Sequence, residues 1–124
     1  MPGKPLLYVL SAILIGMPLP PSAKRLPPKP VSPVYTSTLR IEAPLDNGRE
    51  ARICAYDRVD GRLLWSVAVF EQRIDPNLEE DVQWRFITQM EIDGDAVVVT
   101  AEGGSVYRVS LTTLIVERLW PLRM

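Results

Sequence analysis

Oxygen-bearing side chains alternate along one short stretch of the sequence, Asp75-Pro76-Asn77-Leu78-Glu79-Glu80-Asp81. Alternating carboxylate and amide oxygens are typical of calcium loops. The candidate metal ligands are Asp75, Asn77, Glu79 and Asp81. The EF-hand pattern fails elsewhere, because Glu80 stands where that loop needs glycine and Phe86 where it needs a bidentate glutamate. We therefore expect a solvated acidic loop, with calcium binding or contact with a basic partner as the alternatives.

The rest of the chain holds few groups that could carry out catalysis. Histidine is absent and Cys54 is the only cysteine, which excludes an imidazole base, a His-containing zinc site and an internal disulfide. Asp93 and Asp95 flank Gly94, where aspartates are typical turn residues. We expect no enzyme activity, no cofactor and a buried, inert Cys54 thiol, with an intermolecular disulfide as the alternative for that cysteine.

Charge and aromatic residues argue against nucleic acid as a partner. The formal net charge is −1, and no cluster of arginines is interleaved with aromatic residues. The three tryptophans, Trp65, Trp84 and Trp120, are candidate stacking platforms for carbohydrate. Two of them share their expected strand faces with apolar residues, which favours packing in the core.

These residues must be positioned by strands, because the sequence after residue 34 alternates with a period of two and shows no helical periodicity. Turns rich in Gly and Asp separate the apolar runs. We expect an all-β domain over residues 34–124, an antiparallel meander of six or seven strands. Its third strand, 62–70, is expected to be central because both of its faces are apolar. The expected strands are 38–43, 49–57, 62–70, 84–92, 96–101, 105–111 and 114–120.

One expected hairpin carries a recognisable pattern. The sequence Ala55-Tyr56-Asp57-Arg58-Val59-Asp60-Gly61-Arg62-Leu63-Leu64-Trp65 resembles the A-x-D-x-x-T-G-x-x-x-W signature of quinoprotein (PQQ-type) β-propeller repeats, with Asp60 in place of Thr. An eroded second copy has Ser110, Leu114 and Arg118 where the repeat has Asp, Gly and Trp. The resemblance implies one to two propeller blades, in which the aspartate bonds the turn amides and the tryptophan packs between blades.

Chain length limits what this resemblance implies. A closed propeller needs at least about four blades of about 40 residues each, and only about 90 residues follow the proline-rich region. We therefore expect an open sheet rather than a ring, and the resemblance carries no quinone-binding residue onto this chain. The chain is interpreted either as a dedicated small protein or as an isolated remnant of a longer propeller protein.

The first third of the chain has a different composition. All fifteen Asp and Glu residues follow residue 40, whereas nine of the twelve prolines lie at or before Pro33. Lys4 precedes the apolar run LLYVLSAILIGM, which predicts that residues 1–17 are a signal peptide or, through the uncharged stretch 5–23, a membrane anchor. Residues 18–33 are expected to be an extended spacer that buries no surface and is dispensable for folding. The layout predicts an extracytoplasmic location, secreted or periplasmic.

Together these features predict a non-catalytic, exported or membrane-tethered β-repeat module that acts through protein contacts. The last expected strand, 114–120, is apolar and is expected to be an open edge that pairs with an unknown partner protein or a second copy. The residues expected to carry this contact are Leu114, Val116 and Trp120. The alternative is an extracytoplasmic domain that binds calcium or a glycan through residues 71–84.

Overall fold

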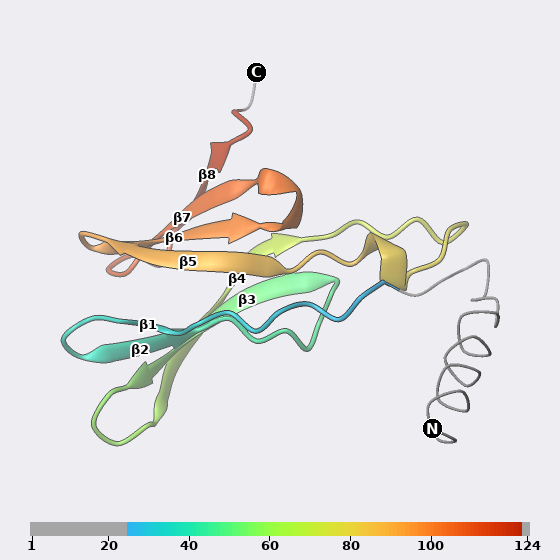
Figure 1. The fold of residues 1–124 in the computed structure, drawn as a ribbon. Helices are drawn as coiled ribbons and strands as arrows, with labels where there is room; N and C mark the ends of the chain where they lie inside the picture. Colours follow the sequence, from blue (N-terminus) through green and yellow to red (C-terminus); the bar gives the residue numbers. More distant parts are fainter. Residues whose placement is uncertain (1–24, 123–124) are drawn as a thin grey trace, which may run out of the picture.

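The computed structural model describes residues 25–122, so the signal-peptide or anchor prediction for residues 1–17 falls outside the described part. Eight strands form two antiparallel sheets of four (Figure 1). Sheet A has the order β1-β2-β3-β4 and sheet B the order β5-β6-β7-β8. The strands are β1 Val34–Tyr35, β2 Leu39–Glu42, β3 Glu50–Asp57, β4 Leu63–Glu71, β5 Ile87–Asp93, β6 Ala96–Ala101, β7 Val106–Ser110 and β8 Val116–Trp120.

The predicted all-β, antiparallel meander is confirmed, and neither sheet closes on itself. The meander is divided between β4 and β5, because residues 72–86 include Pro76 and form only a short 3-10 turn, η1 Asp81–Gln83. A second 3-10 turn, η2 Glu102–Gly104, connects β6 to β7. Over residues 25–122 no helix is long and apolar enough to cross a membrane.

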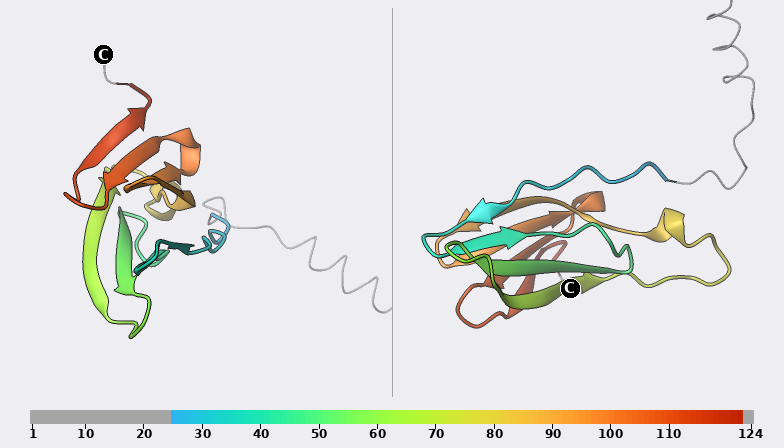
Figure 2. Two further views of the ribbon diagram at one scale, coloured as in Figure 1. Left: turned by 90° about the vertical axis from the view of Figure 1, so that its left-hand side faces the viewer. Right: turned by 90° about the horizontal axis from the view of Figure 1, so that it is seen from below.

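A single apolar core lies between the two sheets, which Figure 2 shows as two layers. The largest fully buried side chains of the core are Ile41 and Ile53 from sheet A and Val97, Val99 and Val109 from sheet B. They alternate with more exposed residues along their strands, as one buried face per strand requires. Phe70 on β4 stacks on Tyr107 on β7, with ring centroids 5.2 Å apart, and this contact joins the layers.

The outward face of each sheet is polar. Its ion pairs are Arg40–Glu42 and Arg52–Glu50 on sheet A, each at 2.8 Å, and Arg108–Asp93 on sheet B at 2.7 Å. These residues alternate with core residues in the strand registers, which places them away from the other sheet. The core is therefore one layer thick, with solvated charges on both sides of it.

Strand β4 lies at the edge of sheet A, so the prediction that it is central is wrong. The apolar residues of β4 differ in burial between its two ends. Val69 and Phe70 are buried against sheet B, whereas Leu63 and Leu64 stay 54% and 40% exposed. No later strand pairs with β4, because the chain leaves sheet A after Glu71 and builds the second sheet.

Strand β5 begins at Ile87 rather than at Trp84, because the preceding residues contact the β2–β3 connection. The N–H of Arg85 donates to the carbonyl of Gly48 at 3.1 Å. A Cβ added at Gly48 would lie 2.1 Å from Cγ of Trp84, so only glycine leaves room for the indole. Trp84 therefore packs on a loop instead of forming a ladder with β6.

The hairpin between β3 and β4 closes with a turn organised by Asp57. The Asp57 carboxylate accepts the N–H groups of Val59 at 2.8 Å and Asp60 at 3.2 Å. The Asp57 carbonyl accepts the N–H of Gly61 at 2.9 Å, and Gly61 has a φ of 77°. The two backbone amides hold the pKa of Asp57 below its usual value.

The hairpin between β7 and β8 repeats this turn with different residues. The Ser110 hydroxyl accepts the N–H groups of Thr112 at 3.3 Å and Thr113 at 3.1 Å. The Ser110 carbonyl accepts the N–H of Leu114 at 2.9 Å, and Leu114 has a φ of 61°. Ser110 and Leu114 thus take the places of Asp57 and Gly61 in the same hydrogen-bond pattern.

Residues 25–33, here called the arm, lie along the domain beside β5 (Figures 1 and 2). Val31 packs against the core, and Arg25 is bonded to groups 59 and 77 residues away. The expectation that residues 18–33 bury no surface is therefore wrong for this part of the segment. The arm is extended, as its prolines require, but it is attached along its length.

Candidate interaction surface

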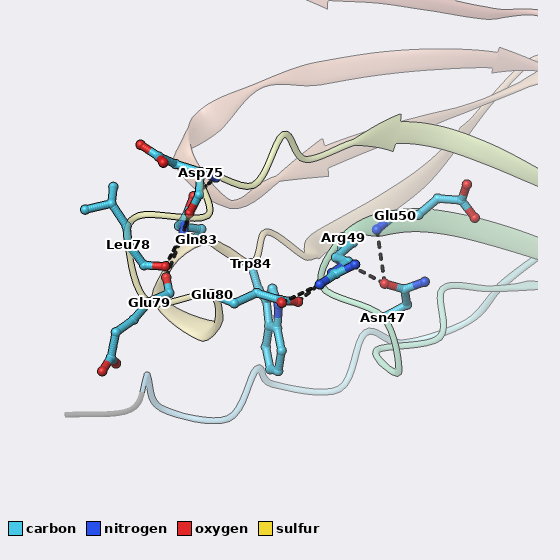
Figure 3. Close-up of polar contacts among 9 residues, drawn as sticks. All are labelled: Asn47, Arg49, Glu50, Asp75, Leu78, Glu79, Glu80, Gln83 and Trp84. Atoms are coloured by element: carbon cyan, nitrogen blue, oxygen red, sulfur yellow. Dashed lines mark hydrogen bonds and ion pairs between the residues drawn. The ribbon is translucent and has the colours of Figure 1, made fainter. Parts of the chain in front are cut away.

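The amide side chain of Gln83 makes most of the hydrogen bonds that organise the first part of the acidic loop (Figure 3). The Nε2 atom of Gln83 donates to the carbonyl oxygens of Asp75 at 3.0 Å, Leu78 at 3.3 Å and Glu79 at 2.8 Å. Gln83 Oε1 also accepts the N–H of Asp75 at 2.7 Å. These carbonyl oxygens therefore already have a partner within the chain.

The four candidate metal ligands do not come together. The Asp75 carboxylate accepts the N–H of Asn77 at 2.9 Å in a local turn, and Glu79 contributes only its carbonyl to Gln83. Over residues 25–122 no group of three or more Asp, Glu or Cys side chains is arranged to hold a metal ion. The structure thus offers no support for the calcium alternative.

Glu80, which the sequence analysis did not select, is the best-connected acid of this loop. Its carboxylate accepts hydrogen bonds from Nε and Nη2 of Arg49. It also accepts one from Nε1 of Trp84 at 2.9 Å (Figure 3). The Arg49 bonds, followed by the Trp84 bond, lower the pKa of Glu80 to about 2. Together with Gly48 these contacts fasten the loop to the β2–β3 connection.

Cys54 is half-buried, so the expectation of a buried thiol is wrong. It pairs with Ser66 across the β3–β4 ladder, on the outward face, and its Sγ lies 3.5 Å from Ser66 Oγ. Its neighbours Ile53 and Ala55 point into the core, which leaves Cys54 on the opposite face.

Strand β8 is an edge of sheet B, as the sequence predicts, but it starts later than expected. Leu114 lies in the turn and outside the strand, because its N–H closes the turn onto Ser110. Val116 is half-buried against the core and Trp120 is 60% exposed. Of the three predicted contact residues, only Val116 and Trp120 therefore belong to the edge strand.

The free edges β4 and β8 border one groove. Its volume is about 680 Å³ and its lining residues are Val69, Phe70, Glu71, Tyr107, Val116, Glu117 and Arg118. Both strands lie on the same side of the molecule, away from β1 and β5 (Figure 2). The groove is lined by the stacked Phe70 and Tyr107 rings together with acidic and basic side chains from the two edges.

The arm occupies a second surface, on the β5 side of sheet B. Arg25 Nη1 donates to the Trp84 carbonyl at 2.7 Å, and Nη2 donates to Glu102 Oε2 at 2.6 Å. The guanidinium also lies 4.8 Å from the centroid of the Phe86 ring. Glu102 Oε1 accepts the N–H of Phe86 at 3.0 Å, so one carboxylate connects the arm to the start of sheet B.

Charge and burial make this contact stronger than an exposed ion pair. The side chains of Arg25 and Glu102 are 19% and 33% exposed. The Arg25 hydrogen bond, with a smaller contribution from the Phe86 amide, holds the pKa of Glu102 below its usual value. Partly desolvated charged hydrogen bonds contribute about 1.5–3 kcal/mol each. The composition of a proline-rich segment does not show which surface the segment contacts, so this site was not predicted from the sequence.

No protein-family model matches the chain, and no curated protein sequence matches it.

Proposed function

We propose that the chain is a non-catalytic β-repeat module, exported or membrane-tethered, that binds a partner protein or a second copy of itself through the edge strand β8 of sheet B. The observation that carries the proposal is the groove between β4 and β8, in which two strand edges that no other strand of residues 25–122 pairs with flank the stacked Phe70 and Tyr107 rings. An open edge presents backbone donors and acceptors in a row, and an added strand satisfies them.

Strand β8 is better suited than β4 to receive an added strand. β4 departs from regular register at two places along its pairing with β3, and such bulges weaken the pairing of an edge. β8 has one irregularity, beside Tyr107, and Val116 to Arg118 pair regularly with β7. The accessible part of β8 therefore presents the more regular backbone.

The hydrogen-bond pattern indicates which groups of β8 point outward. The Ile115 carbonyl accepts the N–H of Ser110 at 3.1 Å, so the backbone of Ile115 faces β7. Along an antiparallel strand, the backbone N–H and C=O groups of successive residues point alternately toward the paired strand and away from it. The N–H of Val116 therefore points outward, away from β7. Val116 also lines the groove with its side chain, so this residue combines an edge donor with an apolar contact.

The repeat interpretation agrees with the architecture. Propeller blades are four-stranded antiparallel sheets, and each half of this chain is such a sheet. The shared turn at Asp57 and Ser110 supports the resemblance of the chain to PQQ-type repeats. Export is proposed from the sequence of residues 1–23 alone.

A photo-crosslinking amino acid in place of Arg118, which lines the groove, tests the edge proposal in cells that make the full chain. We expect an adduct with another protein chain. Val116→Pro, which removes the outward donor, should abolish the adduct. Val116→Thr, which keeps both the N–H and the β-branched shape, should retain it.

The proposal is wrong if no adduct forms, or if the adduct forms equally well in Val116→Pro. Mass spectrometry of the adduct distinguishes a second copy from a different protein, and either identity supports edge pairing.

A further inference from the structure

The side chains of the arm turn inward with a period of three. Arg25, Pro28 and Val31 of the arm are half-buried, as is Val34 at the start of β1, whereas the residues between them are exposed. Three residues per turn is the period of the polyproline II helix, which proline-rich segments adopt without internal hydrogen bonds. The burial pattern of the arm therefore matches contact along one face of a polyproline II helix.

The surface beneath the arm has the chemistry that such helices need. The rings of Trp84 and Phe86 lie edge to face, with centroids 6.5 Å apart, at the start of sheet B. Two cavities of about 470 and 410 Å³ flank Pro27 and Pro28, the first lined by Trp84 and Phe86 and the second by Phe86 and Thr88. Aromatic-lined grooves that take preformed proline-rich helices are a recurring mode of peptide recognition.

The charged end of the surface fixes the direction and register of the bound segment. The guanidinium of Arg25 reaches both the Trp84 carbonyl and the Glu102 carboxylate, and it covers the Phe86 ring. A planar donor fork matches these partners better than a lysine ammonium does. The groove thus recognises an arginine three residues before a proline.

We propose that the surface formed by Trp84, Phe86 and Glu102 is a binding site for arginine-led proline-rich segments of a partner protein, of the form Arg-x-x-Pro-x-x-Val. The arm is its resident occupant and competes with such a segment. The site lies at β5, whereas the edge of the proposed function is β8 at the opposite side of sheet B, so each proposal is tested separately.

A fluorescent peptide of sequence KRLPPKPVSP, which copies residues 24–33, tests the site on the full chain. We expect weak binding to the wild-type chain, because the attached arm has an effective concentration in the millimolar range. Arg25→Ala in the chain loosens the arm and should tighten peptide binding at least about tenfold. The Nε1–H resonance of Trp84 should shift on binding.

Changes in the peptide keep the test independent of the stability of the protein. Replacing the peptide arginine by alanine should weaken binding to the Arg25→Ala chain at least about tenfold, since the charge-assisted bonds are lost. Inserting one alanine between the arginine and the first proline breaks the period of three and should weaken binding as much. Inserting it after the final proline should have no effect.

Equal binding of all these peptides, or no binding to either chain, would overturn the proposal. Binding that leaves the Trp84 resonance unchanged would also overturn it, because the peptide would then occupy another surface.

Discussion

The last hairpins of the two sheets use one hydrogen-bond pattern with two different sets of residues. At β3–β4 the acceptor is a carboxylate and the positive-φ position is Gly61. At β7–β8 the acceptor is a hydroxyl and the positive-φ position is Leu114. Since a left-handed conformation costs an ordinary residue about 1–2 kcal/mol, the second turn stores strain that the first does not. The same turn can thus form from residues that do not favour its backbone conformation.

Gly61→Val should place more backbone strain in the β3–β4 turn than the β7–β8 turn contains. Of the changes considered, it should have the largest effect on stability. No atom lies within 4 Å of a Cβ added at Gly61, so only backbone strain opposes the substitution. We expect the free energy of unfolding to fall by about 1–3 kcal/mol, since a β-branched residue at positive φ is strained. Thermal denaturation measures the change, and Gly61→Asn, which tolerates this conformation, is the control. Equal melting temperatures for the valine variant and wild type would contradict the turn.

Leu114→Gly places glycine at the positive-φ position of the β7–β8 turn, the position that Gly61 already occupies in the β3–β4 turn. We expect the free energy of unfolding to rise by about 0.5 kcal/mol, as relief of strain exceeds the lost contacts of a half-buried side chain. Leu114→Ala, which shortens the side chain but keeps the strain, should destabilise. Chemical denaturation of both variants separates the two contributions, and a glycine variant less stable than the alanine variant would refute the interpretation.

The pH dependence of the two turns differs, and this is the smallest expected effect. The pKa of Asp57 is lowered in the folded state by the amides of Val59 and Asp60. Its contribution is therefore present above the unfolded pKa of about 3.9 and is lost as pH falls through the lowered folded value. Ser110 does not titrate in this range. Unfolding at pH 7 and pH 2.5 should show a smaller stability difference in Asp57→Asn than in wild type, and no such reduction in Ser110→Ala.

The turn at Asp57 could be predicted because a short segment contains everything that forms it, an aspartate and a glycine at the right spacing. The position of β4 could not, because an apolar strand looks the same whether a neighbouring strand or an opposite sheet covers it. The role of Gln83 could not be predicted either, because the path of the loop determines which three carbonyl groups lie near its side-chain amide.

The arm shows a different limit of sequence reasoning. Proline content correctly predicts an extended chain, but it does not indicate whether that chain contacts a surface. The signal was present in the spacing of Arg25, Pro28 and Val31, which gains meaning only when Trp84, Phe86 and Glu102 are known to lie opposite. A period of three in a proline-rich segment therefore merits the same attention as a period of two in a strand.

The ion pairs on the two outward faces have a consequence for the growth of the architecture. In repeat proteins each unit buries its faces against its neighbours, and an array ends in units whose outer face is polar. Here Arg40–Glu42 and Arg52–Glu50 on sheet A, and Arg108–Asp93 on sheet B, give each sheet a charged outward face of the kind that terminal units have. Under the proposed repeat interpretation, a third sheet inserted between these two would have to be apolar on both faces.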